Sequence, residues 1–155
     1  MPIGEHFTQK RVEFHETDRV GMAHFSNYFR YMDTAVAEFF RALQLPGPLT
    51  RYWGGNEDDE MDWPYVNVSC DFKKPAQFDD LIQIHVWVQR IGNKSLTLGI
   101  SFKRETEELA AGQTTIVCSI GTRGRPKTIE IPPPIRQAIT VPSWYSEKKK
   151  GDNES

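Results

Sequence analysis

The sequence predicts an α+β domain in which an antiparallel sheet of about five strands wraps around one long central helix. The first observation is a run of apolar residues at helical spacing between Tyr28 and Leu43. The second is a series of segments after the helix in which apolar and polar residues alternate strictly, as in half-buried strands. A single amphipathic helix beside several such strands buries its apolar stripe against one face of their sheet.

Each element is predicted from a local pattern. Val12 and Phe14 alternate with polar neighbours and indicate a short first strand, and Leu45–Pro48 ends the helix. Strands are expected next around 66–70 and 82–88, and Ile91–Lys94 is typical of a hairpin turn. The return strand places Leu96, Leu98, Ile100 and Phe102 on one face, and a last strand covers about 110–120.

The chain of 155 residues is expected to form a single domain over residues 1–141. Residues 142–155 form a C-terminal tail, and its charged end from Glu147 is predicted to be disordered.

Composition excludes several partners. The net charge of −2 gives no basic field for nucleic acid or a membrane surface, and no apolar run approaches a membrane span. Cys70 and Cys118 have no metal-ligand spacing around them, so no metal site is expected. Free cysteines and the lack of a signal peptide favour a cytoplasmic protein.

The segment Glu16–Tyr28 carries the candidate chemistry. Asp18 lies in a tight connection just before the helix, and Gly21 allows the backbone to come close to a ligand. The first turn of the helix offers unpaired N–H groups and the positive end of its dipole. A carboxylate facing such donors suits acyl transfer. Asp18 capping the turn is the alternative.

At these residues the chain resembles the 4-hydroxybenzoyl-CoA thioesterase family of hotdog-fold enzymes. Thr17–Gly21 and Ser26–Asp33 fit the family's aspartate–glycine loop and the helix that follows it, while Asp71–Asp80 and Ile131–Ile139 resemble its second strand and closing segment. The resemblance implies a hotdog fold. It also implies hydrolysis of an acyl-CoA or aroyl-CoA to the free acid and CoA, with no cofactor because CoA is part of the substrate.

The resemblance also implies roles for residues. Asp18 attacks the thioester carbonyl or activates the water that does, and the backbone N–H of Phe25 polarises the carbonyl oxygen. Asn27 and Tyr28 are the predicted substrate contacts at the helix start. Two arginines that flank Gly124, Arg123 and Arg125, are the preferred partners for the CoA phosphates.

One branch of the family has a Tyr four residues before the aspartate and a His seven after it. Here these positions hold Phe14 and Phe25, and the histidine present, His24, is displaced by one residue. His24 is therefore either a group for proton transfer or an ordinary surface histidine.

Subunits of the resembled family join their sheets edge to edge, so a homodimer is expected, with a homotetramer left open. Two other functions remain possible from the sequence. One is a non-catalytic acyl-CoA-binding hotdog protein, and the other is an acyl-carrier-protein thioesterase that uses the same site.

Overall fold

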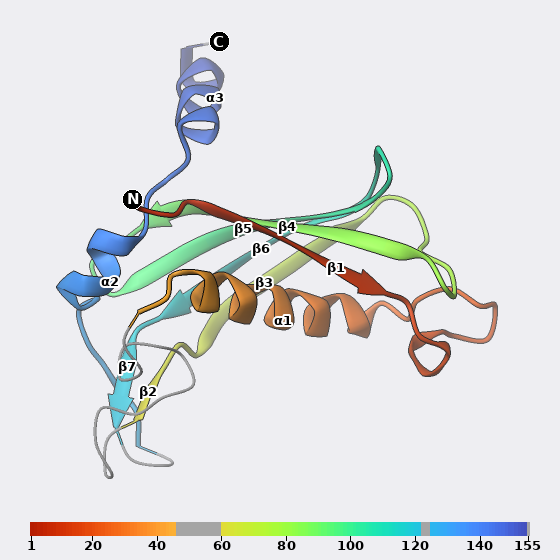
Figure 1. Cartoon of the computed structure of the whole chain (residues 1–155), viewed down its shortest axis with the longest axis horizontal. Helices are drawn as coiled ribbons and strands as arrows, with labels where there is room; N and C mark the ends of the chain where they lie inside the picture. The colour runs from red at the N-terminus through yellow and green to blue at the C-terminus, as the bar shows by residue number, and fades with distance from the viewer. Residues whose placement is uncertain (46–59, 122–124, 155) are drawn as a thin grey trace.

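The computed structural model describes residues 1–45, 60–121 and 125–154. Over these residues a five-stranded antiparallel sheet with the order β1-β4-β5-β6-β3 curves around helix α1 (Figure 1). A small second sheet has the order β2-β7-β8. The elements are β1 (Glu5–Arg11), a 3₁₀ turn (Phe14–Glu16), α1 (Ser26–Ala42), β2 (Glu60–Asp62), β3 (Tyr65–Phe72), β4 (Leu81–Ile91), β5 (Ser95–Arg104), β6 (Glu107–Val117), β7 (Ser119–Gly121), β8 (Lys127–Thr128), α2 (Pro133–Ala138) and α3 (Ser143–Glu154).

Helix α1 forms the core together with the concave face of the sheet. Its apolar stripe is fully buried, and so are the apolar residues of β4 and β5 that face it. Gly112 of β6 lies where α1 crosses the sheet, because a Cβ there would come within 2.3 Å of the Met32 methyl carbon. The predicted α+β arrangement and the predicted inner face of β5 are confirmed; that face consists of Leu96, Leu98, Ile100 and Phe102.

The first strand differs from its prediction. β1 ends at Arg11, and Phe14 lies in the 3₁₀ turn with its ring 78% exposed. The Glu16 carboxylate accepts a hydrogen bond from the Glu13 backbone N–H, and the Glu16 N–H donates to the Glu13 carbonyl. This reciprocal capping tightens the chain into a turn, and alternation of side chains alone does not reveal it.

The C-terminal tail, whose end the sequence predicts to be disordered, is helical over its described residues. Residues Ser143–Glu154 form helix α3, which projects from the body near the N-terminus (Figure 1). Trp144 and Tyr145 anchor its first turn on the outer face of the sheet, against the half-buried Trp87 ring. The Trp144 indole N–H donates to Glu5 at 3.0 Å. The charged residues that suggested disorder include three lysines, which are good helix formers once the first turn is fixed.

The two edges of the sheet differ in their side chains. β3 forms one edge, and the Phe72 ring at its end contacts Tyr28 of α1 at a centroid distance of 5.0 Å. Side chains alternate along a strand, so Val68 lies on the same concave face as Phe72, whereas a bulge between Tyr65 and Asn67 interrupts the alternation at Val66. The Val66, Val68 and Phe72 side chains are exposed in the single chain, by 60%, 39% and 50% respectively. Exposed apolar side chains therefore lie along this edge strand.

Candidate active site

The loop between the 3₁₀ turn and α1 is organised by the Asp18 carboxylate. Its Oδ1 atom accepts hydrogen bonds from the backbone N–H groups of Val20 at 2.9 Å and Met22 at 3.1 Å. Gly21 adopts a φ of +81°, which a side chain would disfavour. Gly21 does not line the cavity described below, so its contribution is this turn conformation rather than close approach to a ligand. Asp18 does cap its turn, as the alternative interpretation proposed.

Two further contacts hold the loop against the rest of the fold. The Glu16 carbonyl accepts the His24 N–H at 2.9 Å and the Asn27 side-chain amide at 2.7 Å. On the other side, the Ala23 N–H donates to the Ala76 carbonyl at 2.7 Å. Asn27 is only 8% exposed and does not line the cavity. The structure therefore places this predicted substrate contact behind the loop, where it ties α1 to the loop.

A cavity of about 530 Å³ opens between this loop, the start of α1 and the end of β3. Four predicted site residues meet there: Asp18, His24, Phe25 and Tyr28. The other lining residues are Met22, Ala23, Phe72, Lys73, Lys74 and Pro75. Most of the wall is apolar, and the charged groups are concentrated at Asp18 and the two lysines.

The beginning of α1 provides a backbone hydrogen-bond donor at the cavity. Helix α1 starts at Ser26, with Phe25 at the N-cap position. Within the described part of the chain, no carbonyl or side chain accepts the Phe25 backbone N–H. This N–H lies at the positive end of the helix dipole and remains available to a ligand oxygen.

Tyr28 adds a protonated hydroxyl to the wall. Burial raises the pKa of the Tyr28 phenol above its ordinary value. The side chain is 3% exposed and packs edge-on against Phe72 and Phe102. An aromatic corner therefore closes one side of the cavity.

Two lysines supply the cations that line the cavity among the described residues. Lys73 and Lys74, which directly follow β3, line the cavity and form ion pairs with Glu108 and Glu107. Arg125 lies beside Gly121, at the end of β7, and Figure 1 places β7 at the opposite end of α1 from the Asp18 loop. Arg123 lies outside the described residues. The adjacent Lys73-Lys74-Pro75 signal was available in the sequence, within the segment that resembled the family's second strand.

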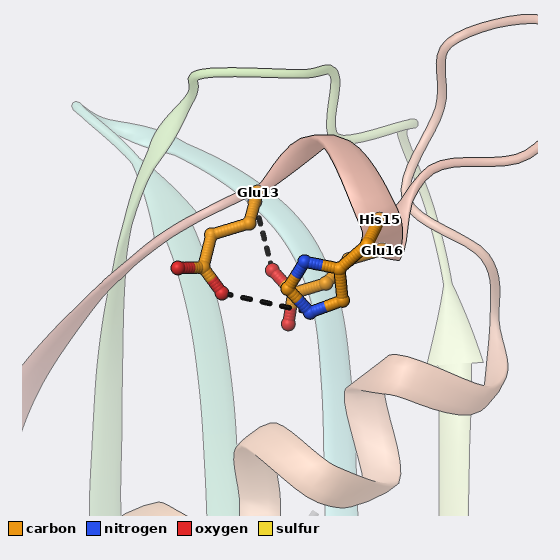
Figure 2. A group of neighbouring side chains, drawn as sticks. All are labelled: Glu13, His15 and Glu16. Atoms are coloured by element: carbon orange, nitrogen blue, oxygen red, sulfur yellow. Dashed lines mark hydrogen bonds and ion pairs between the residues drawn. The ribbon is translucent and has the colours of Figure 1, made fainter.

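Neither a metal site nor a thiol nucleophile competes with this site among the described residues. Glu13, His15 and Glu16 bring ligand atoms within 4.8 Å of one another (Figure 2). The Lys10 ammonium already lies 3.0 Å from Glu13 and 3.5 Å from Glu16, so the cluster is neutralised by an internal cation. Burial raises the pKa of both cysteine thiols to about 11, which keeps them protonated at neutral pH.

Comparison with known proteins agrees with this architecture. The sequence profile of the thioesterase superfamily matches residues 20–111. A putative esterase of Aquifex aeolicus is 31% identical over 106 residues, covering 68% of this chain and 78% of the relative. The 4-hydroxybenzoyl-CoA thioesterase of Pseudomonas sp. strain CBS-3 is 29% identical over 100 residues, covering 63% of this chain and 67% of the relative.

Solved structures share the fold. A gentisyl-coenzyme A thioesterase superposes with a TM-score of 0.72 and 26% identity, over 84% of this chain and 99% of its own. The Pseudomonas enzyme superposes with a TM-score of 0.75 and 23% identity, over 87% and 99%. The fold is thus that of the hotdog thioesterases, as predicted.

The chain belongs to the thioesterase superfamily, a family of thioester hydrolases. The family match begins two residues after Asp18, so the role of this carboxylate depends on the geometry of its loop. No helix among the described residues is long and apolar enough to span a membrane.

Proposed function

We propose that the protein hydrolyses an acyl-CoA or aroyl-CoA thioester to the free carboxylic acid and CoA, with Asp18 as the catalytic carboxylate. The observation that carries the proposal is the cavity in which Asp18, the unpaired Phe25 N–H and an apolar wall lie together. The relatives that act on hydroxybenzoyl-CoA and gentisyl-CoA support a CoA thioester as the substrate.

The two oxygen atoms of the Asp18 carboxylate have different roles. Oδ1 holds the loop through two N–H groups, whereas Oδ2 accepts no hydrogen bond from the described residues. Oδ2 is therefore the atom that attacks the carbonyl carbon or takes a proton from the attacking water. As the carbonyl carbon becomes tetrahedral, its oxygen gains negative charge, which the Phe25 N–H and the helix dipole stabilise. The C–S bond then breaks and sulfur leaves with the electron pair. Where Asp18 itself attacks, water then cleaves the resulting acyl–Asp18 anhydride, which releases the free acid and restores the carboxylate.

The wall chemistry matches the two halves of such a substrate. Phe25, Tyr28 and Phe72 form an apolar, aromatic surface for the acyl or aroyl group. Lys73 and Lys74 form the cationic rim toward which the CoA phosphates are directed. Although paired with Glu108 and Glu107, the Lys73 and Lys74 side chains are about half exposed and can meet a second anion.

The functional unit is a homodimer formed along β3. The exposed side chains of Val66, Val68 and Phe72 lie on β3, whose outer edge is paired by no other described strand, and such edges are paired or protected in native proteins. Because β3 runs directly into Lys73 and Lys74, a partner that pairs with this edge also borders the cavity. Arg123 and Arg125 of that partner remain candidates for binding the CoA phosphates. Two such dimers could also pair into a homotetramer.

The test measures thiol release from a panel of acyl-CoA and aroyl-CoA esters by the wild type and by Asp18→Asn. The wild type is expected to turn over at least one class, and the variant is expected to lose about 10²-fold or more in kcat. Asp152→Asn, an exposed carboxylate on α3, is the control and should match the wild type.

Other outcomes separate the alternatives. Binding of CoA esters without turnover by either protein would indicate a non-catalytic acyl-CoA-binding protein. Turnover of acyl-carrier-protein thioesters but not of CoA esters would indicate an acyl-carrier-protein thioesterase. Incorporation of ¹⁸O from labelled water into Asp18 during a single turnover would identify Asp18 as the nucleophile rather than the general base.

A further inference from the structure

His24 is held in one tautomer by the helix that it precedes. Its Nδ1 atom lies 2.7 Å from the Ser26 hydroxyl and 3.4 Å from the Ser26 backbone N–H. A backbone N–H can only donate, so the nitrogen facing it must carry a lone pair. Nδ1 is therefore the acceptor, the Ser26 hydroxyl also donates to it, and the ring proton resides on Nε2.

The Ser26 hydroxyl and the Ser26 backbone N–H both donate to Nδ1, so Nε2–H is the donor that the ring has left for another group. The charged groups on the walls of the same cavity are Asp18 from the loop and Lys73 and Lys74 after β3. Asp18 directs Oδ1 to its own turn and keeps Oδ2 free of hydrogen bonds from the described residues, and the two lysines are paired with Glu108 and Glu107.

We propose that His24 is a catalytic hydrogen-bond donor which, as a neutral imidazole, donates from Nε2 to the thioester carbonyl oxygen beside the Phe25 N–H. This inference depends on the hydrolysis proposed above and assigns the second donor to the developing oxyanion. His24 lines the cavity next to Phe25, the residue that supplies the first donor.

No proton leaves His24 during the reaction. Water or Asp18 forms the new bond to the carbonyl carbon, the C–S bond breaks, and the CoA sulfur takes the electron pair and later a proton from water. A neutral imidazole is a very weak acid, so its Nε2–H stabilises the oxyanion by hydrogen bonding without transfer.

Ser26 is a positioning residue in this arrangement. Its hydroxyl fixes the ring through Nδ1, while Ser26 itself is absent from the described lining of the cavity. The short Ser–His contact also resembles a nucleophile and its base. Its location outside the cavity, together with the N–H donated to the same nitrogen, favours the positioning role.

The experiment compares His24→Leu, His24→Gln, Ser26→Ala and Ser26→Thr on the best CoA ester. His24→Leu is expected to lose on the order of 10²-fold in kcat with little change in KM, as for removal of one oxyanion donor. His24→Gln keeps an N–H near the Nε2 position and should recover most of that loss. Ser26→Ala should lose only a few-fold, and Ser26→Thr should restore it. His15→Leu, which removes an exposed histidine, is the matched control.

The pH profile provides a readout that a structural role would not affect. A histidine acting as a general acid produces a fall in kcat above about pH 6.5, the ordinary imidazole range. A neutral donor produces no such limb, so the wild type and His24→Gln should have profiles of the same shape between about pH 6 and 8. Imidazole ¹⁵N shifts should report Nε2–H and an unprotonated Nδ1 in the wild type.

Specific results would overturn the inference. Full activity of His24→Leu would make His24 a surface residue, and an imidazole-dependent limb that disappears in His24→Gln would make it a proton donor. Complete inactivity of Ser26→Ala would make Ser26 the nucleophile. If Asp18→Asn is inactive while His24→Leu matches the wild type, this inference alone fails. If the wild type hydrolyses no CoA ester, the proposed function fails first.

Discussion

The two walls of the cavity are built in opposite ways. The wall formed by the loop 16–25 is complete within one chain, since the Glu16 carbonyl, the Asn27 amide and Asp18 Oδ1 fix its backbone. The wall formed by β3 and Lys73–Pro75 ends at a strand edge that no other described strand pairs, and this edge carries exposed apolar side chains. The first wall carries the proposed chemistry, and the second carries the proposed recognition of the substrate and of the second subunit.

The difference shows how a hotdog chain can keep its catalytic geometry while its specificity varies. The loop wall depends on a few hydrogen bonds from the Asp18 and Asn27 side chains to backbone groups, which substitutions elsewhere leave in place. The β3 wall depends on exposed side chains, which can change without disturbing the core. Substitutions on the two walls should therefore alter different measured quantities.

The largest effect is expected at the β3 wall. The double substitution Val66→Lys and Val68→Lys places two charges on the exposed β3 edge and should convert the proposed dimer to a monomer. Activity should then fall by about 10²-fold, because the wall shared with the partner is lost. Light scattering and thiol release measure the two effects.

Leu81→Lys is the control, since Leu81 is 41% exposed against 39% for Val68 but lies on β4. A double variant that remains dimeric would place the interface elsewhere.

An intermediate effect is expected when the loop wall is loosened from behind. Asn27→Ala removes the amide that donates to the Glu16 carbonyl and should lower the free energy of unfolding by about 1–3 kcal/mol. We expect kcat to fall about tenfold while KM changes little, because the loop carrying Asp18 becomes less ordered. Denaturant unfolding and steady-state kinetics test this.

Asn93→Ala, in the exposed β4–β5 turn, is the control and should change neither the free energy of unfolding nor kcat. A raised KM with normal kcat would argue for direct substrate contact by Asn27.

The smallest effect concerns the ion pair at the cationic rim. The Lys73 ammonium beside Glu108 holds the pKa of that carboxyl below its usual range. A depressed carboxyl pKa stabilises the fold above the pKa of the unfolded chain, and this stabilisation is lost as the pH falls through the folded pKa. Glu108→Gln should thus lower the free energy of unfolding by less than about 1 kcal/mol at pH 7, and the difference should vanish below about pH 4. A difference that persists in acid would reflect packing rather than charge. Glu147→Gln on α3 serves as the control.

Periodicity predicted the layers of this fold, and specific side-chain contacts produce the turn and the terminal helix that it did not predict. The helix and the inner face of β5 follow directly from apolar spacing, because burial on one face imposes that spacing. The 3₁₀ turn after β1 depends on Glu13 and Glu16 capping each other, and α3 depends on Trp144 finding Trp87 across the sheet. Such pairings join residues whose proximity the sequence does not display.

The site was predictable to the extent that it is local. Asp18, His24, Phe25 and Tyr28 are close in sequence, and all four line one cavity. Lys73 and Lys74 enter it only because the β3 end lies beside the loop, where Met22 pairs with Gln77 and the Ala23 N–H bonds to the Ala76 carbonyl. Asn27 looked like a ligand contact from its position, but its side chain points to the backbone of the preceding turn.

The docking of Trp144 on Trp87 gives the C-terminal helix its own optical signal. The two indole rings lie with their centroids 5.5 Å apart and their planes at 57°, and both rings are close to Tyr145. Chromophores this close share their excited states, so the pair should contribute an exciton couplet to the circular dichroism of the native protein. Release of α3 from the sheet would abolish the couplet while leaving the core intact. The attachment of the tail can therefore be followed in solution without a label, separately from the unfolding of the domain.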